Sequence, residues 1–212
     1  MFTGIVQALA PVVLSTVEGG VLRLRVRMGN LTGGLQIGAS VAVNGTCLTV
    51  TGYSPDVVHF DVIEETRQLT NIGSVSVGDL VNVERSFRAG DEIGGHVVSG
   101  HIAGTVEVID IATAEGVRNI TFRANPALMK YLLHKGFVAL DGASLTIAFV
   151  DYSTNHFGVC LIPETIERTT LGRVVVGSRV NVEPDSQTQT IVDTVERLFR
   201  NEDLLIRLRG QT

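Results

Sequence analysis

The sequence has only two cysteines, Cys47 and Cys160, and no tryptophan among its 212 residues. Two thiols cannot build a disulfide framework or a four-thiolate zinc site. No apolar run approaches the ~18 residues that a membrane-spanning helix needs. The first residues lack the basic and apolar regions of a signal peptide. These absences lead us to expect a soluble cytoplasmic protein with no membrane partner.

Positive charge is also in short supply. The formal net charge is −5 at pH 7, whereas a protein that binds nucleic acid chiefly through its backbone needs a basic face. We therefore expect no nucleic-acid partner. Hydrophobic residues make up 44% of the chain and charged residues 18%, so the chain can bury a core and is not a disordered tail. Its length suits one or two domains.

The chain does contain a series of short β-branched segments separated by turn signals such as Asn44-Gly45. Residues 21–27 alternate strictly between apolar and arginine side chains, which is typical of a half-buried strand. Arg23, Arg25 and Arg27 then form a charged outer face to which we assign no function. Further strands are expected at 40–43, 48–51, 57–62 and 80–84. Short strands at this spacing predict a small closed barrel or a sandwich.

Two helices are expected, one from Pro126 to His134 and a longer one from Ser186 onward. For the second, Ser186 and Gln189 have the spacing of a capping box. Apolar residues then recur at three- and four-residue steps: Ile191, Val192, Val195, Leu198 and Phe199. Such a helix could pack back on its own domain or meet its equivalents about a three-fold axis.

The sequence is also repeated. Residues 44–50 (NGTCLTV) align with residues 141–147 (DGASLTI), and residues 77–84 (VGDLVNVE) align with residues 176–183 (VGSRVNVE). Gly4 aligns with Gly100, and Glu65-Thr66 with Glu164-Thr165. The blocks keep their order while the offset grows slowly, as insertions in surface loops would produce. We infer two tandem copies of one β-module of roughly 90 residues, followed by a C-terminal tail.

The repeats share paired small polar residues on one strand face, Cys47 with Thr49 and Ser144 with Thr146. Such pairs usually face water, but in a small barrel they can line a ligand pocket. The copies differ where Cys47 becomes Ser144, Asn44 becomes Asp141, Ile5 becomes His101 and Ser86 becomes Asp185. Two similar pockets with unequal polar groups would suit two copies of one substrate in different roles. Duplication for stability alone is the alternative.

Several motifs together resemble the riboflavin synthase family, and the resemblance runs from residue 1 to about residue 199. They are MFTGIVQ at 1–7, NGTCLTV at 44–50, DEIGGHVVSGH at 91–101, KGF at 135–137, DGASLT at 141–146 and LIPET at 161–165. Thr46 and Cys160 depart from the pattern, since a relative has Cys and His there.

The resemblance implies an all-β fold with minor α structure: two six-stranded closed barrels and a C-terminal helix. The expected domains are residues 1–96 and 97–184, each a lumazine-binding barrel, and residues 185–212, a trimerisation helix and tail. The implied activity is that of a transferase in riboflavin biosynthesis. It dismutates two 6,7-dimethyl-8-ribityllumazine molecules into riboflavin and 5-amino-6-ribitylamino-uracil, with no cofactor and no metal. The implied assembly is a homotrimer whose working site lies between the N-terminal barrel of one subunit and the C-terminal barrel of its neighbour.

By the same resemblance, each barrel is assigned one substrate pocket. The N-barrel pocket would comprise Gly4, Ile5, Val6, Cys47, Leu48, Thr49, Asp61, Val62, Ile63, Glu64, Glu65 and Thr66. The C-barrel pocket would comprise Gly100, His101, Ile102, Lys135, Ser144, Leu145, Thr146, Cys160, Leu161, Ile162, Pro163, Glu164 and Thr165.

The chemistry requires a base to deprotonate the 7-methyl group of one lumazine, donors to stabilise the resulting anion, and a nucleophile. The catalytic candidates are His101, Cys47, Ser144, Thr146 and Asp185. His101 suits proton transfer because an unperturbed histidine has a pKa of ~6.5. A free cysteine in a strand is usually a small buried hydrophobe, so a direct role for Cys47 stays open. His96 and His101, without further ligands nearby in sequence, are weak evidence for a metal.

Two other functions remain open from the sequence. The same scaffold occurs in lumazine-binding antenna proteins, which hold a chromophore without converting it. The duplicated barrels could also be structural, with no ligand. The presence of Cys47, Ser144, His101, Asp185 and the helical tail favours the enzyme.

Overall fold

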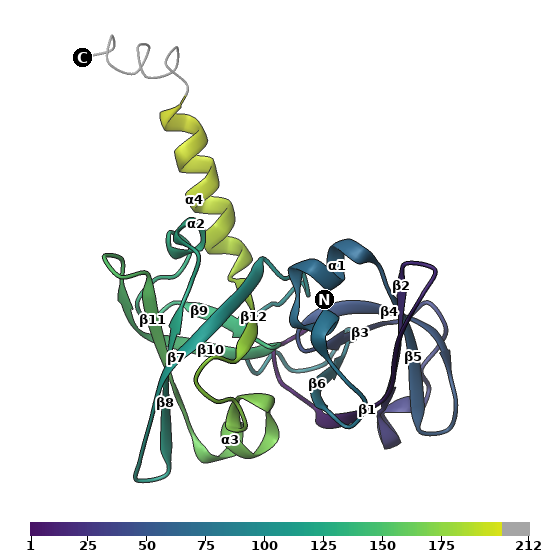
Figure 1. The fold of residues 1–212 in the computed structure, drawn as a ribbon. Helices are drawn as coiled ribbons and strands as arrows, with labels where there is room; N and C mark the ends of the chain where they lie inside the picture. Colours follow the sequence, from purple (N-terminus) through teal and green to yellow (C-terminus); the bar gives the residue numbers. More distant parts are fainter. Residues whose placement is uncertain (201–212) are drawn as a thin grey trace, which may run out of the picture.

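The computed structural model describes residues 1–200, which form two closed six-stranded antiparallel barrels side by side and a C-terminal helix (Figure 1). Neighbouring strands of the first barrel follow the order β1-β2-β5-β4-β3-β6. Its strands are β1 (Ala8–Glu18), β2 (Val21–Arg27), β3 (Ser40–Val43), β4 (Thr46–Tyr53), β5 (Val57–Val62) and β6 (Leu80–Arg85). Every strand segment expected here from the β-branched pattern is present.

The second barrel repeats this arrangement. Its strands are β7 (Gly104–Ala114), β8 (Val117–Arg123), β9 (Phe137–Leu140), β10 (Ala143–Asp151), β11 (His156–Leu161) and β12 (Arg179–Pro184). Their order around the barrel is β10-β11-β8-β7-β12-β9, in which each strand has the same neighbours as its counterpart in the first barrel. The predicted fold class, two closed six-stranded barrels with little helix, is confirmed.

The helices are short except the last. They are α1 (Glu64–Leu69), α2 (Pro126–Met129), α3 (Pro163–Arg168) and α4 (Ser186–Phe199), with 3₁₀ turns η1 (Gly29–Thr32), η2 (Asn71–Ser74) and η3 (Thr170–Gly172). Within residues 1–200, no helix is both long enough and apolar enough to cross a membrane. Figure 1 shows α4 leaving the second barrel and pointing away from both barrels.

Both helix predictions need correction. The first helix ends at Met129 rather than His134. After Met129 the chain makes i to i−3 hydrogen bonds, from the amides of Tyr131 and Leu132 to the carbonyls of Leu128 and Met129. This tighter turn buries Leu132. In α4 the cap is Asp185, not Ser186: the Asp185 carboxylate accepts a 2.8 Å hydrogen bond from the amide of Thr188. The predicted tail beyond residue 200 lies outside the described residues.

Each barrel is filled by its own apolar core. In β2, for example, Leu22, Leu24 and Val26 are buried, while the arginines between them face outward. Arg23 pairs with Asp61 and Arg27 with Asp56 on that outer face. The first core also takes Phe60 and Val83, and the second is built on Ile120, Phe122, Phe157 and Leu161. Because these side chains fill the interiors, a ligand has to bind outside the barrels.

The barrels are joined by the segments that precede them. Phe2 pairs with Val98 in an antiparallel bridge, and these two side chains pack with Ala42 and Ala139 in a small apolar cluster of their own. A Cβ added at Gly45 would lie only 2.6 Å from the amide nitrogen of Gly142, so the equivalent turns of the two repeats touch backbone to backbone. The repeats therefore face each other through equivalent residues.

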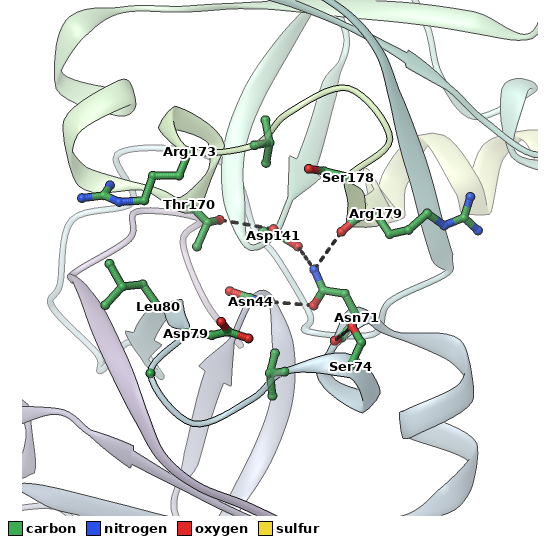
Figure 2. A pocket seen from close by; sticks show the side chains of 13 residues that line it. Asn44, Asn71, Ser74, Asp79, Leu80, Asp141, Thr170, Arg173, Ser178 and Arg179 are labelled. Carbon is green, nitrogen blue, oxygen red and sulfur yellow. Dashed lines mark hydrogen bonds between the residues drawn. The ribbon is translucent and has the colours of Figure 1, made fainter.

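A buried polar cluster lies beside this contact (Figure 2). Asp141 Oδ1 accepts hydrogen bonds of 2.8 Å from the Asn71 amide group and from the backbone amide of Asn181, and its Oδ2 accepts one of 3.2 Å from Thr170. Asn44, the equivalent of Asp141, accepts from the amide of Asn82 at 2.8 Å. Burial raises the pKa of Asp141 to about 7, although all three donors favour the ionised form.

Candidate functional site

The shared polar residues lie on the outer faces of the barrels. Along β4, Leu48 and Val50 point into the core, so Cys47 and Thr49 point out. Along β10, Ile147 is buried in the second core while Ser144 is half-buried and Thr146 is exposed. The strand alternation expected from the sequence is therefore present, and it places both polar pairs on the surface near the junction of the barrels.

Each of these strands is covered by a segment from the other repeat. The amide of Cys47 donates to the carbonyl of Gly100 at 2.9 Å, and the amide of Ser144 donates to the carbonyl of Gly4 at 2.8 Å. Both glycines have positive φ, +85° and +74°. An added Cβ would lie 2.6 Å from the Cβ of Cys47 or Ser144, respectively, so only glycine permits this approach.

These contacts correct the expected grouping of the two pockets. The sequence analysis groups Gly4 with Cys47 and Gly100 with Ser144. In the structure, Gly4 lies against Ser144 and Gly100 lies against Cys47. Val6 confirms the exchange, because its side chain packs into the core of the second barrel. The sequence alignment of the repeats identified the equivalent segments correctly but could not show that each segment crosses to the other barrel.

A cavity of about 270 Å³ opens beside Cys47, which we call the Cys47 pocket. It is lined by Thr46, Cys47, Glu65, Thr66, Leu69, Thr70, Gly100, His101 and Ile102. Residues from β4 and α1 thus form one side, and Gly100, His101 and Ile102, in the segment that crosses over from the second repeat, form the other. The pocket brings together six residues that the sequence analysis proposed, and it adds Thr46, Leu69 and Thr70.

The corresponding position of the second barrel, the Ser144 site, contains a residue that the sequence analysis did not select. Nδ1 of His96 lies 2.6 Å from Oγ of Ser144, and the imidazole stacks on Phe137 with ring centroids 5.1 Å apart. His96 is buried, and burial lowers its pKa, while the nearby Asp185 carboxylate acts in the opposite direction. A neutral imidazole in this position can accept a proton through the serine hydroxyl.

The sequence does not indicate this pairing, because 48 residues separate His96 from Ser144 and no local pattern joins them. The one sequence feature that could have indicated a close contact here is the pair Gly94-Gly95, which directly precedes His96. A Cβ at Gly95 would lie 2.7 Å from the Cβ of Ser144, so this glycine lets the segment approach β10. Asp185, a predicted catalytic residue, is close enough to influence His96 and also caps α4.

Other predicted site residues are placed less favourably. Leu48, Val62 and Leu161 fill the barrel cores, so their side chains cannot reach a ligand. Three carboxylates are engaged in surface ion pairs: Asp61 with Arg23, Glu64 with Arg67 and Glu164 with Arg168. The remaining exposed residues are Ile5, Thr49, Ile63, Lys135, Thr146, Cys160, Ile162 and Pro163, whereas Leu145 and Thr165 are half-buried. Residues 1–200 hold no cluster of three or more His, Cys, Asp or Glu placed for a metal ion.

Comparison with known proteins identifies the family to which this repeated fold belongs. A family model described as the lumazine binding domain matches residues 3–86 and again residues 99–185. The repeated barrel fold and the two matches thus define a protein with duplicated lumazine binding domains. Riboflavin synthase of Escherichia coli (strain K12) is 52% identical over 202 residues, covering 94% of this chain and 93% of the relative. Riboflavin synthase of Chlamydia pneumoniae is 44% identical over 200 residues, covering 94% and 97%. The chain belongs to the riboflavin synthase family.

Solved structures with the same fold carry ligands of this class. LumP complexed with 6,7-dimethyl-8-(1'-D-ribityl) lumazine has a TM-score of 0.77 at 27% identity, covering 86% of this chain and 98% of LumP. LumP complexed with riboflavin has a TM-score of 0.80 at 26% identity, covering 88% and 100%.

Proposed function

We propose that this protein is a transferase that makes riboflavin from two molecules of 6,7-dimethyl-8-ribityllumazine. One molecule donates a four-carbon unit to the other, and the donor leaves as 5-amino-6-ribitylamino-uracil, so no external cofactor is required. The observation that carries this proposal is the pair of equivalent sites with unequal chemistry. Cys47 occupies one site, and Ser144 hydrogen-bonded to His96 occupies the other. Membership of the riboflavin synthase family supports it.

The Ser144 site is suited to the proton transfer that this reaction needs. Removing a proton from the 7-methyl group places negative charge in the conjugated ring, so a base and nearby donors lower the barrier. His96 remains neutral near pH 7 because burial lowers its pKa, and it can take the proton relayed through Ser144. We assign His96 and Ser144 to this step, with Asp185 stabilising the imidazolium that forms. His101, Cys47 and Thr146 remain catalytic candidates.

Holding two rings in contact would supply much of the rate, since proximity alone can contribute ~7–11 kcal/mol. We infer that the working site joins the Cys47 pocket of one subunit to the Ser144 site of a neighbour in a homotrimer. The exposed apolar side of α4 supports an assembly: Ile191, Val195, Leu198 and Phe199 are 43–68% exposed. Of the two alternatives raised from the sequence, these exposed side chains favour contact with equivalent helices, although the polar side of α4 contacts its own barrel through Asp193 and Glu196.

The remaining expectations complete the proposal. We divide the chain into lumazine-binding domains at residues 1–96 and 97–184 and a trimerisation helix and tail at 185–212. We place the protein in the cytoplasm, with no nucleic-acid or membrane partner. Residues 1–6 belong to the first domain by sequence, but Gly4 and Val6 contact the second barrel.

The test is a cofactor-free assay. Purified protein mixed with 6,7-dimethyl-8-ribityllumazine should develop the longer-wavelength absorbance of riboflavin, and chromatography should recover one riboflavin and one pyrimidine for every two lumazines consumed. A stable complex without turnover would instead identify a chromophore-binding protein. Calorimetry with an unreactive lumazine analogue should show two sites per chain, and a single site per assembly would contradict the paired-site proposal.

A further inference from the structure

Two buried glutamates hold the segments that cross between the barrels, one at Thr3-Gly4 and the other at Ser99-Gly100. On β6, Glu84 Oε1 accepts hydrogen bonds from the amide of Thr3 at 2.6 Å and from its hydroxyl at 2.8 Å, and Oε2 accepts one from the amide of Gly4 at 3.0 Å. Each carboxylate oxygen is thus used, and all three donors belong to the first crossing segment.

The second repeat reproduces this arrangement. On β12, Glu183 Oε1 accepts from the amide and the hydroxyl of Ser99, both at 2.7 Å, and Oε2 accepts from the amide of Gly100 at 3.0 Å. Glu84 and Glu183 are each 4% exposed. Isolated carboxylates are costly to bury, so two such groups in equivalent places, each with three donors, form a built feature of the fold.

The residues held in this way are those that contact the two sites. Gly4, held by Glu84 of the first barrel, lies against Ser144 of the second. Gly100, held by Glu183 of the second barrel, lies against Cys47 of the first. An added Cβ at either glycine would lie only 2.6 Å from the neighbouring Cβ, so both contacts are tight and a small shift of the segment changes the site.

We propose that Glu84 and Glu183 are positioning residues that act across the barrels, Glu84 on the Ser144 site and Glu183 on the Cys47 pocket. The link to Ser144 includes its histidine, because the carbonyl of Thr3 accepts a 3.2 Å hydrogen bond from the backbone amide of His96. The inference rests on the proposed function only for the claim that these sites bind lumazine. The contacts themselves are independent of turnover.

The matched variants are Glu84→Gln and Glu183→Gln. A glutamine places an NH₂ group against donors that already point at the carboxylate, so the segment loses at least one hydrogen bond and gains a repulsive contact. Because the two glutamates have the same burial and the same donor set, each variant serves as the control for the other. Full-length protein in a Cys160→Ser background leaves Cys47 as the only thiol.

The first measurement is the alkylation rate of Cys47 with iodoacetamide. We expect Glu183→Gln to raise this rate about tenfold, because the hydrogen bonds to the Glu183 carboxylate hold the segment against Cys47. Glu84→Gln should leave the rate within about twofold. The second measurement is the NMR titration of the His96 imidazole. Here Glu84→Gln should shift the curve and Glu183→Gln should not. Equal effects of both variants on both probes, or effects confined to each residue's own barrel, would overturn the proposal.

Should a glutamine variant fail to fold, Glu84→Asp and Glu183→Asp retain the charge and shorten the reach. Backbone amide spectra should then show Gly4 and Ser144 shifted in the first variant and Gly100 and Cys47 shifted in the second; the reverse pattern would also overturn the inference. Since neither probe requires lumazine, a protein that lacks synthase activity but gives the crossed pattern would refute the proposed function and leave this inference standing.

Discussion

Oγ of Ser144 lies 2.6 Å from Nδ1 of His96, and the equivalent position of the first repeat is Cys47. The two repeats therefore present a hydroxyl next to a base on one side and a thiol on the other. For a reaction between two identical molecules, this difference provides a physical means of giving them different roles. Because the two sites carry different side chains, the role of each can be tested separately by mutation.

Replacement of the base should reduce turnover without abolishing binding. His96→Gln removes the proton acceptor and keeps a hydrogen-bonding side chain, so we expect kcat for riboflavin formation to fall by about 10²–10⁴. In the unmodified protein, kcat should decline as the pH falls through the lowered pKa of His96, below 6.5. Absorbance assays from pH 5 to 8 measure both effects. The exposed His134 provides the control His134→Gln; equal losses in the two variants would argue against the assignment.

Asp185 has two roles that mutation can separate. Asp185→Asn preserves an oxygen that caps α4 but removes the charge, so the pKa of His96 should fall further and the acid limb of the rate profile should move to lower pH. Asp185→Ala should in addition destabilise the protein by about 1 kcal/mol through loss of the cap. Rate profiles and denaturant unfolding distinguish these outcomes. An unchanged acid limb in both variants would remove Asp185 from the proposed step.

The close approach of Gly4 to Ser144 should be sensitive to a single methyl group. Gly4→Ala combines an unfavourable positive φ with a 2.6 Å clash, so we expect a loss of about 2–4 kcal/mol in unfolding free energy and of ligand binding at the Ser144 site. Gly19 also has positive φ, but nothing lies within 4 Å of its added Cβ. Gly19→Ala should therefore cost only about 1 kcal/mol. Similar losses in both would show that backbone strain alone is responsible.

The sequence predicted the strands of the barrels well because their signals are local, whereas the closed six-stranded barrels were implied by the family resemblance. Alternation at residues 21–27 defines β2 from end to end, and the repeated NGTCLTV and DGASLTI blocks defined two equivalent strands. The exchange of crossing segments could not be read in the same way. Gly4 and Gly100 align with each other in the repeat, so either could serve either barrel. Only packing, such as Val6 entering the second core, decides between the two arrangements.

The same limit explains why the sequence did not reveal the pairing of His96 with Ser144 or the capping of α4 by Asp185. The pairing of His96 with Ser144 depends on the path of residues 94–98 across β10, which no periodicity encodes. At α4 the capping pattern was recognised but placed one residue late, because Asp185 and Ser186 are both good caps and only the path of the chain distinguishes them.

Asp141 should make stability depend on pH. Its pKa is raised from 3.8 to about 7, so the native state binds the proton more tightly than the unfolded state. The contribution of Asp141 to stability should be fully present below pH 4 and should be lost as the pH rises through about 7, a change of up to about 4 kcal/mol. Asp141→Asn, which copies Asn44 of the other repeat, should flatten this slope in urea unfolding between pH 4 and 8. The exposed Asp110→Asn variant should retain the original slope; a slope unchanged in Asp141→Asn would contradict the prediction.

The exposed side of α4 should control assembly. Val195→Asp places a charge among Ile191, Leu198 and Phe199, so the assembled protein should dissociate to monomers in light-scattering measurements and lose synthase activity. Gln187→Asp, on an exposed polar position of the same helix, should change neither. A Val195→Asp protein that remains trimeric would exclude this face as the contact.

The exchange of the crossing segments also bears on how the duplication has been maintained. Each barrel is completed by a stretch of chain that belongs, by sequence, to its neighbour. Deleting either copy would remove the segment that lies against Cys47 or Ser144 in the remaining barrel, unless a second copy of the chain supplied the equivalent segment. The exchange thus ties the two repeats together structurally, while the residues at the two sites remain free to differ, as Cys47 and Ser144 do.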